Sequence, residues 1–203
     1  MVKFCDVNPR ALLLMVMTTD NQRGRPGRRA LLDVEQVIDA ALAVLDADGL
    51  DAVTFRRVSA DLGVSHMTLY GYFDSKEALL EALVARTIAV PSIRATANAP
   101  WDEALLNSVE ELHQTLVARP GIAEVLITQE LKGSWVGDVR EGLLDILRSA
   151  GCDEQQATDG ISIIFNYLLG AVMIQTNRGQ GGSPESFKRG LRYLINGIEC
   201  DSL

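Results

Sequence analysis

Side chains able to bind nucleic acid are concentrated in one short stretch of this chain, between positions 65 and 72. Ser65, His66, Thr68, Tyr70 and Tyr72 carry hydroxyl, imidazole or phenol groups. Groups of this kind form hydrogen bonds with base edges or phosphate oxygens, and a threonine methyl group can also contact the methyl group of a thymine. The chemistry predicted for this stretch is therefore recognition of double-stranded DNA.

The segment before these residues has the pattern of an amphipathic helix that leads into a turn. Phe55, Val58 and Leu62 recur at intervals of three and four, which places them on one helical face. Gly63 follows where the chain must leave this helix, because glycine adopts a left-handed conformation without steric cost. Ser65 can then accept a backbone N–H as the N-cap of a second helix. The spacing predicts a helix-turn-helix.

The second helix is predicted to be short. It begins near His66 and ends around Tyr72 or Phe73. We expect Met67, Leu69 and Phe73 to form its limited buried surface, which leaves the polar residues available for a groove of DNA.

A further helix is predicted to begin almost at once. Asp74 and Glu77 stand at the spacing of a capping box, which indicates a helix from about Ser75. Lys76 would lie in its first turn, where a cation is unfavourable for the helix dipole but favourable beside a phosphate. The position of Lys76 therefore favours a DNA-phosphate contact.

The run LGVSHMTLYGYFDSKEALLEAL, residues 62–83, resembles the recognition-helix signature of the tetracycline repressor (TetR) family. The matching positions are Leu62, Gly63, Val64, Ser65, Thr68, Leu69, Tyr70, Tyr72, Phe73, Lys76 and Leu79. The resemblance implies an all-helical, dimeric, ligand-responsive transcriptional regulator. It places the family's DNA-contacting positions on Thr54, Arg56, Thr68, Tyr70, Tyr72 and Lys76. Gly71 stands where relatives often carry a larger residue.

The overall charge opposes DNA binding, whereas the local charge favours it. The chain has a formal net charge of −8 and a sequence pI of about 4.8, and phosphate neutralisation needs local positive charge. Residues 23–29 nevertheless contain four arginines, Arg25 and Arg28 among them, and Arg56, Arg57 and Lys76 lie in the motif. Residues 23–29 resemble the arm that many such regulators place on or beside the minor groove, although a solvated tail would have the same composition.

Apolar periodicity predicts helices from Asp33 onward and indicates no strand, so the expected fold class is all-α. Asp33 is a plausible N-cap and Gly49 a stop for the first helix, which would complete a three-helix DNA-binding head. We assign residues 23–74, with the basic arm 23–29, to this helix-turn-helix domain and residues 75–203 to a helical ligand-binding and dimerisation domain. Helices of the second domain are expected at about 75–90, 101–118, 121–131, 135–150, 153–178 and 184–198.

Residues 1–22 do not continue these patterns. The apolar run Ala11–Met17 weakly suggests a signal peptide, but no small-residue cleavage site follows and the run is too short to span a bilayer. We expect a disordered extension or a start codon assigned too far upstream; an arm that packs is the alternative. Cys5, Cys152 and Cys200 lack metal or redox spacing, so we expect reduced thiols in a cytoplasmic protein without a membrane partner.

The helix expected from Asp153 to about Arg178 is apolar on nearly all sides from Ile161 onward, which indicates that a partner covers part of it. Together with the last helix it predicts a four-helix dimer interface across a two-fold axis. The residues assigned to this interface are Ile161, Ile164, Leu168, Val172, Phe187, Leu191 and Leu194. The alternative is that this stripe forms the core of a single chain.

The resemblance also implies a small-molecule pocket inside the second domain. Polar or aromatic residues amid apolar faces are the candidates: His113, Gln129, Trp135, Phe165, Asn166 and Tyr167. Asn166 is favoured because it interrupts an apolar helix, where an unpaired buried amide costs about 1 to 3 kcal/mol. Residues of these types are more often ordinary core or surface residues than ligand contacts.

Nothing in the sequence indicates catalysis, a cofactor or a metal. His66 and His113 are the two histidines, which argues against a metal cluster and a Ser-His-Asp arrangement. The favoured hypothesis is a homodimeric repressor that a small-molecule effector releases from a palindromic operator. An activator on the same fold, or a helical carrier or enzyme with a relict DNA head, is the alternative.

Overall fold

The computed structural model describes residues 32–88, 99–131, 134–178 and 183–198. Regular structure in these ranges is helical and no strand occurs in them, which confirms the predicted all-α fold. The extension 1–22 and the basic arm 23–29 lie outside the described residues.

The first described helices build a small head. They are α2 (Val34–Asp48), the 3₁₀ turn η1 (Leu50–Ala52), α3 (Phe55–Asp61) and α4 (His66–Leu69), and α5 (Lys76–Thr87) follows them. Asp33 caps α2 in a full capping box with Gln36, and Gly49 ends the helix at φ 82°. Both predictions for this helix are confirmed.

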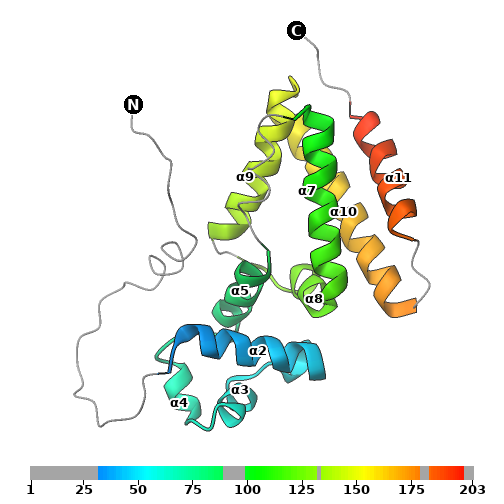
Figure 1. Ribbon diagram of the computed structural model, residues 1–203. Coiled ribbons are helices and arrows are strands. Elements are labelled where there is room, and N and C mark those ends of the chain that lie inside the picture. Colours follow the sequence, from blue (N-terminus) through cyan, green and yellow to red (C-terminus); the bar gives the residue numbers. More distant parts are fainter. Residues whose placement is uncertain (1–31, 89–98, 132–133, 179–182, 199–203) are drawn as a thin grey trace, which may run out of the picture. The chain divides into compact units, whose positions relative to one another are not determined.

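The core of the head is apolar and closed. Val37, Ile38, Val58 and Leu69 are fully buried, and Phe73 is nearly so. These residues belong to α2, to α3 and to the segment around α4. Helix α3 packs on both α2 and α4, and α5 packs against α2 (Figure 1). Burial of this small apolar set from separate helices fixes the position of α4.

The remaining described helices form a bundle around α7. They are α7 (Trp101–Ala118), α8 (Pro120–Thr128), α9 (Ser134–Ser149), α10 (Glu154–Arg178) and α11 (Pro184–Asn196). Figure 1 shows α7 running between α9 and α11 with α10 beside it, and α7 contacts all four other helices. Leu105, Leu116, Leu144, Leu168 and Leu191 are fully buried where these helices meet. A proline at the first position of α8 separates it sharply from α7.

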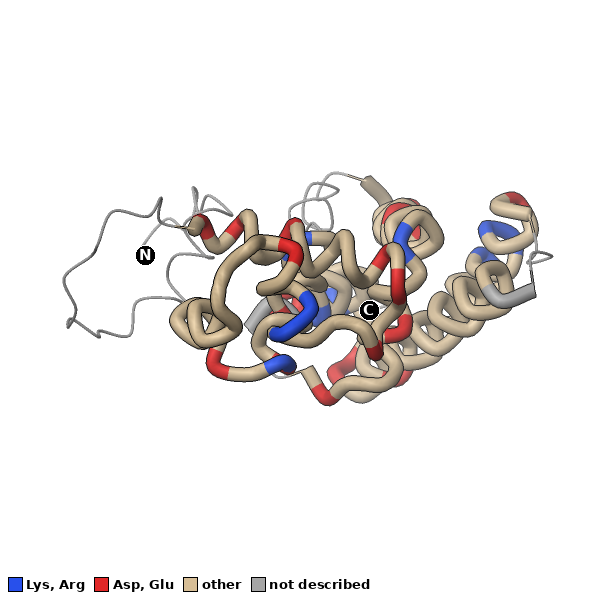
Figure 2. Tube along the Cα trace, turned by 90° about the horizontal axis from the view of Figure 1, so that it is seen from below, with Lys and Arg blue, Asp and Glu red and all other residues tan. Residues whose placement is uncertain are grey.

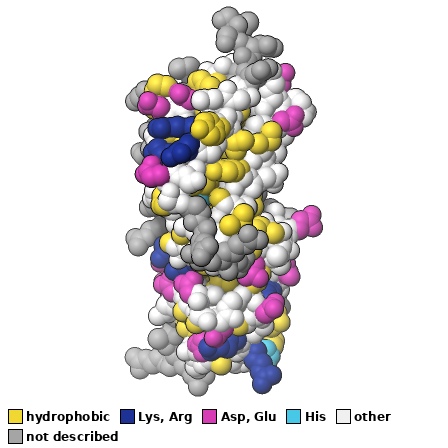
Figure 3. Space-filling view, turned by 90° about the vertical axis from the view of Figure 1, so that its right-hand side faces the viewer, with side chains coloured by type: hydrophobic (Ala, Val, Ile, Leu, Met, Phe, Trp, Pro, Cys, Tyr) yellow, Lys and Arg dark blue, Asp and Glu magenta, His cyan; other side chains and the backbone are white. Residues whose placement is uncertain are grey.

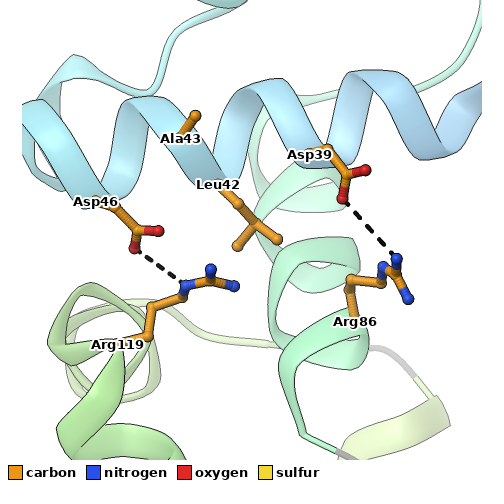
Figure 4. A pocket seen from close by; sticks show the side chains of 6 residues that line it. All are labelled: Asp39, Leu42, Ala43, Asp46, Arg86 and Arg119. Carbon is orange, nitrogen blue, oxygen red and sulfur yellow. Dashed lines mark ion pairs between the residues drawn. The ribbon is translucent and has the colours of Figure 1, made fainter.

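A hollow of about 430 Å³ lies where α2 meets α5 and the start of α8. Figure 4 shows Arg119 reaching Asp46 and Arg86 reaching Asp39, with Leu42 between the two pairs. The N–O distances are 3.1 Å for Arg119–Asp46 and 4.0 Å for Arg86–Asp39. These side chains are partly exposed, so each pair contributes little to stability on its own. Their role here is to join α2 to the helices that follow.

Two details differ from the expectations. The N-cap of α5 is Ser75, whose hydroxyl oxygen accepts the N–H of Ala78 at 3.2 Å, and not Asp74. One residue of register decides between two good capping residues, and spacing alone does not fix it. Cys152 is nearly buried and disulfide-bonded, which contradicts the expectation of reduced thiols for this cysteine.

The segment Glu154–Thr176 of α10 is long and apolar enough to cross a membrane, judged by length and composition only. Core helices of proteins without a membrane domain have the same properties. In this chain α10 packs on α7, α8, α9 and α11.

Candidate nucleic-acid interface

The turn between α3 and α4 has the geometry that the sequence predicts. Gly63 adopts the left-handed conformation at φ 66°. This conformation is energetically unfavourable for a residue that carries a Cβ. The Val64 N–H then donates to the carbonyl oxygen of Ser59 at 3.0 Å. Ser65 caps α4, its hydroxyl oxygen accepting the N–H of Met67 at 3.3 Å. The helix-turn-helix is thus held by backbone conformation and by a cap.

Helix α4 is shorter than predicted. It ends at Leu69, and the chain continues as tight turns in which the N–H groups of Gly71 and Tyr72 donate three residues back, to Thr68 and Leu69. Ser65, His66, Thr68 and Tyr70 are exposed on this element, whereas Tyr72 is half-buried and has an interaction partner. Four of the five predicted polar residues are therefore exposed to solvent.

Tyr70 is fixed by its ring. The ring centroid lies 4.7 Å from that of Phe55 in α3, at an interplanar angle of 74°, an edge-to-face contact. Phe55 is nearly buried, while Tyr70 remains 51% exposed. The phenol is consequently held at a defined position and presented to solvent, which suits a hydrogen bond to DNA.

Met67 contradicts the prediction that it is buried, since 64% of it is exposed. Leu69 and Phe73 are buried instead. Residues four apart share a helical face, whereas Met67 stands two residues from Leu69 and so points roughly 200° away from it. The prediction placed Met67, Leu69 and Phe73 on one buried surface from their apolar character alone, without regard to their angular positions around the helix.

The residues of α3 divide into two roles. The Thr54 hydroxyl oxygen caps α3 by accepting the Arg57 N–H at 3.1 Å, and Arg56 is exposed. Arg57 pairs with Asp48 at 3.0 Å and also with Asp61. The hydrogen bond with Asp48 and the charge of Asp61 hold the pKa of Arg57 above its ordinary value. The charge of Arg57 is thus compensated by Asp48 and Asp61, whereas no ion pair of Arg56 occurs among the described residues.

Lys76 lies at the start of α5, as predicted, and is half-buried. Its Nζ approaches the carbonyl oxygen of Leu50 at 3.4 Å, a long hydrogen bond that links α5 to η1. Lys76 therefore has an internal contact that spacing did not indicate. Arg25 and Arg28 lie outside the described residues.

Charges of both signs occupy the side of the molecule seen in Figure 2. The described part of the head thus shows no uniform basic face of the kind expected for a tight DNA-binding surface.

The best-defined candidate for ligand binding is His113 in α7. It is 4% exposed and its Nε2 has no hydrogen-bond partner. Its ring stacks on Phe187 of α11 at 3.8 Å and 12°, and Phe187 stacks on Tyr167 of α10 at 5.2 Å. Burial lowers the pKa of His113, with Gln175 and Glu110 acting in the opposite direction. An unpaired nitrogen in such a place is costly unless something binds it.

Of the other ligand candidates, Tyr167 belongs to the same ring stack as His113 and Phe187. Gln129 ends α8 and its amide donates to the Thr128 hydroxyl oxygen at 3.1 Å. Phe165 is half-buried, and Trp135 belongs to α9 with its side chain outside what the structure describes. Asn166 is exposed, so the argument from an unpaired buried amide fails for this chain.

The residues predicted to form a dimer interface mostly form the core of the chain. Ile161, Ile164, Leu168, Val172, Phe187 and Leu191 are buried, and Leu194 is half-buried. The burial of this apolar stripe within the single chain favours the alternative of an intrachain core for the six buried residues, while Leu194 keeps part of its surface exposed.

Other side chains of the same two helices are exposed. Ile163 (54%) and Ile174 (50%) lie on α10 and Tyr193 (70%) lies on α11. Asn166 and Gly170 continue the α10 face, because positions 163, 166, 170 and 174 recur at three or four residues. Figure 3, which looks onto the side of the molecule where α11 lies, shows hydrophobic side chains gathered over the upper part of this side. We call Ile163, Asn166, Gly170, Ile174 and Tyr193 the α10–α11 outer face.

Metal binding finds no support in the described residues, which contain no group of three or more His, Cys, Asp and Glu side chains that could hold an ion.

Comparison with known proteins gives matches over both parts of the chain. Residues 37–83 match the model of bacterial regulatory proteins of the tetR family, and residues 95–185 match that of the tetracyclin repressor-like C-terminal domain. The tetracycline repressor protein class D of Escherichia coli is 32% identical over 153 residues, which cover 72% of this chain and 67% of that protein.

Two further proteins show the same relationship. The HTH-type transcriptional repressor DrrR1 of Streptomyces coeruleorubidus is 28% identical over 167 residues, or 81% of this chain. The match spans 62% of the length of DrrR1, less than two thirds. The structure of a TetR variant from Acinetobacter baumannii AYE in complex with minocycline superposes with a TM-score of 0.70 at 26% identity, covering 82% of this chain and 96% of that one.

Proposed function

Since the chain belongs to the tetR family of bacterial regulatory proteins and is thus a DNA-binding transcriptional regulator, we propose that it is a homodimeric repressor released from a palindromic operator by a small molecule. The observation that carries this proposal is the exposed surface of α4. There a cap at Ser65 and the ring contact of Tyr70 with Phe55 fix hydrogen-bonding groups that the core of the head does not use.

The exposure of the side chains supports an assignment of the DNA contacts. Ser65, His66, Thr68 and Tyr70 are exposed and would face the major groove, where base edges are distinguishable. Thr54, Arg56, Tyr72 and Lys76 would bind phosphates, while Arg25 and Arg28 of the arm would add to the positive charge of Arg56 and Lys76. Phosphate contacts set the register and base contacts the sequence preference. Residues 23–74 form this DNA-binding domain.

Dimerisation through the α10–α11 outer face would supply a second DNA-binding head, which a palindromic operator requires. Isolated surface hydrophobics are ordinary, but several on one face of two neighbouring helices favour an interface. A two-fold dimer would read half-sites about one helical turn, roughly 34 to 36 Å, apart. Residues 75–203 supply both this interface and the effector site.

Effector binding is assigned to the second domain near His113, which would serve as its polar anchor. No hydrogen-bond partner of the His113 Nε2 occurs among the described residues, and the curated relatives include tetracycline repressors. Helix α8 contacts α7 and α10 on one side and α2 and α5 on the other, so a ligand that moves α8 also moves the heads. An effector acts only by differential affinity for the two arrangements.

No catalytic step belongs to this proposal, because the related proteins are regulators and the exposed chemistry suits binding. A cytoplasmic location follows from access to the operator.

Fluorescence anisotropy with the DNA flanking the chain's own gene tests the proposal. Measured at physiological salt with non-specific competitor, specific binding of a dimer with a dissociation constant of about 10⁻⁸ M or tighter is expected. A selection of bound fragments from the whole genome covers an operator elsewhere. If neither experiment yields a sequence bound in preference to competitor, the proposal is wrong.

A further inference from the structure

Met67 is the most exposed large hydrophobic side chain of the described head. Among residues 32–88, Met67 at 64% and Tyr70 at 51% are the large hydrophobic residues that are more than half exposed. They stand three residues apart, so they lie on neighbouring parts of one side of α4. Tyr70 is explained by its contact with Phe55, whereas Met67 has no such contact with another ring in this structure.

The fold of the head does not need the Met67 side chain. The Ser65 cap uses only its backbone N–H, and the apolar contribution of this element to the core comes from Leu69 and Phe73. A single exposed methionine elsewhere would need no explanation. This one lies between His66 and Thr68, which are exposed and polar, in the middle of the surface assigned to the major groove.

We propose that Met67 contacts the C5 methyl group of one thymine in each operator half-site and thereby sets the sequence preference at that base pair. The inference rests on the proposed function and deepens it. The thymine methyl is the apolar feature of the major groove, and it distinguishes thymine from the other three bases. An unbranched thioether with three rotatable bonds adapts to such a group without an exact fit.

Thr68 is the competing candidate, because its side chain also carries a methyl group. The two residues differ in reach and in angle: Thr68 is short and branched at Cβ, whereas the methionine side chain extends further from α4. Side-chain chemistry favours Met67, because the threonine hydroxyl can form hydrogen bonds in the groove, whereas the methionine side chain offers mainly apolar contact. The two readings predict different outcomes for matched variants.

The experiment measures the affinity of the full-length protein for operator duplexes in which single thymines are replaced by uracil. Uracil lacks only the methyl group, so base pairing and the remaining groove chemistry are kept. The operator comes first from selection out of random-sequence duplexes. For the unsubstituted protein we expect a loss of about fourfold at one thymine in each half-site, the value for one buried methyl-sized group.

Variants then assign the contact. In Met67→Ala the uracil penalty at that position is expected to vanish, and in Met67→Leu it is expected to persist. In Thr68→Ser, which removes a methyl group and keeps the hydroxyl, the penalty should persist as well. Because Met67 is exposed, the alanine variant is expected to unfold at the same temperature as the parent chain, and circular dichroism verifies this.

Each remaining outcome overturns the inference. If no thymine is sensitive to uracil, or if Met67→Ala keeps the full penalty, Met67 does not read a methyl group. Loss of the penalty in Thr68→Ser alone assigns the contact to Thr68 instead. Those results leave the proposed function intact, whereas failure to select any sequence overturns the proposed function and this inference together.

Discussion

Gly121 lies directly against the side chain of Leu45: a Cβ built on Gly121 would stand 2.7 Å from the Cγ of Leu45 and 2.9 Å from its Cδ1. Leu45 is a buried residue of α2 and Gly121 belongs to the first turn of α8. Two residues before Gly121, Arg119 pairs with Asp46. The start of α8 is therefore close-packed on α2, and a side chain at position 121 would require the Leu45 side chain or the two helices to shift.

Substitution Gly121→Ala is expected to destabilise the protein by about 1 to 3 kcal/mol, the usual cost of overpacking a core. Denaturant unfolding followed by circular dichroism measures the change. Gly137→Ala in α9 is the matched control, since a Cβ there meets nothing within 4 Å and alanine favours a helix by up to about 1 kcal/mol. Equal stability of the two variants would show that the Leu45 contact does not constrain the protein in solution.

Two substitutions of Tyr70 separate the contribution of its ring from that of its hydroxyl group. Tyr70→Phe keeps the contact with Phe55 and removes one hydrogen bond to DNA, for which we expect a loss of operator affinity of about 2- to 12-fold. Tyr70→Ala removes both, and specific binding should disappear while the dimer stays intact. Anisotropy titrations and light scattering test the two statements. Full operator affinity in Tyr70→Ala would remove Tyr70 from the DNA interface.

Local patterns predicted the helices and the turn well, because each depends on a few neighbouring residues. Asp33, Gly49, Gly63 and Ser65 have the predicted roles. The division of an apolar helix between core and interface was not predictable in this way. Whether Ile164 or Ile163 is buried depends on the direction from which α7 and α9 approach α10, and sequence periodicity does not contain that information.

Dependence on tertiary packing also decides which parts of the candidate sites were predictable. The polar residues of α4 lie in one short stretch of the chain, so their grouping could be predicted from the sequence. Lys76 and His113 found partners from distant segments, the carbonyl group of Leu50 and the ring of Phe187. Contacts between residues so far apart in the sequence depend on tertiary packing, so they could be identified only from the structure.

The burial of His113 is expected to make the stability of the protein depend on pH. Burial lowers its pKa in the folded state below the ordinary value of 6.5, so the unfolded chain binds a proton more readily. This contribution to stability is complete above about pH 6.5 and is lost as the pH falls through the folded-state pKa. The free energy of unfolding should therefore fall less between pH 7.5 and 5.5 in His113→Gln than in the parent chain. Identical pH dependence in the two proteins would contradict the burial of His113.

Lys76 is predicted to contact a phosphate although its Nζ also approaches the Leu50 carbonyl oxygen. Lys76→Gln keeps a side-chain donor and removes the charge. Loss of one phosphate contact reduces the slope of log K against log salt by about 0.9, and weakens binding to all sequences alike. Arg140→Gln, an exposed change in α9, controls for net charge. An unchanged slope in Lys76→Gln would leave this residue with its structural contact alone.

The α10–α11 outer face predicts which substitutions separate the dimer. Ile163→Glu places a charge on this face and should give a monomer that stays helical, because Ile163 is 54% exposed in the single chain and burial of an unpaired carboxylate opposes association. Ile127→Glu in α8 is the matched control: Ile127 is 50% exposed and lies on another helix, so its mass should remain that of a dimer. Leu168→Glu, in contrast, places a charge in the core and should unfold the chain. Size-exclusion chromatography with light scattering and circular dichroism distinguishes the three results. A dimeric Ile163→Glu variant would place the interface on a different surface.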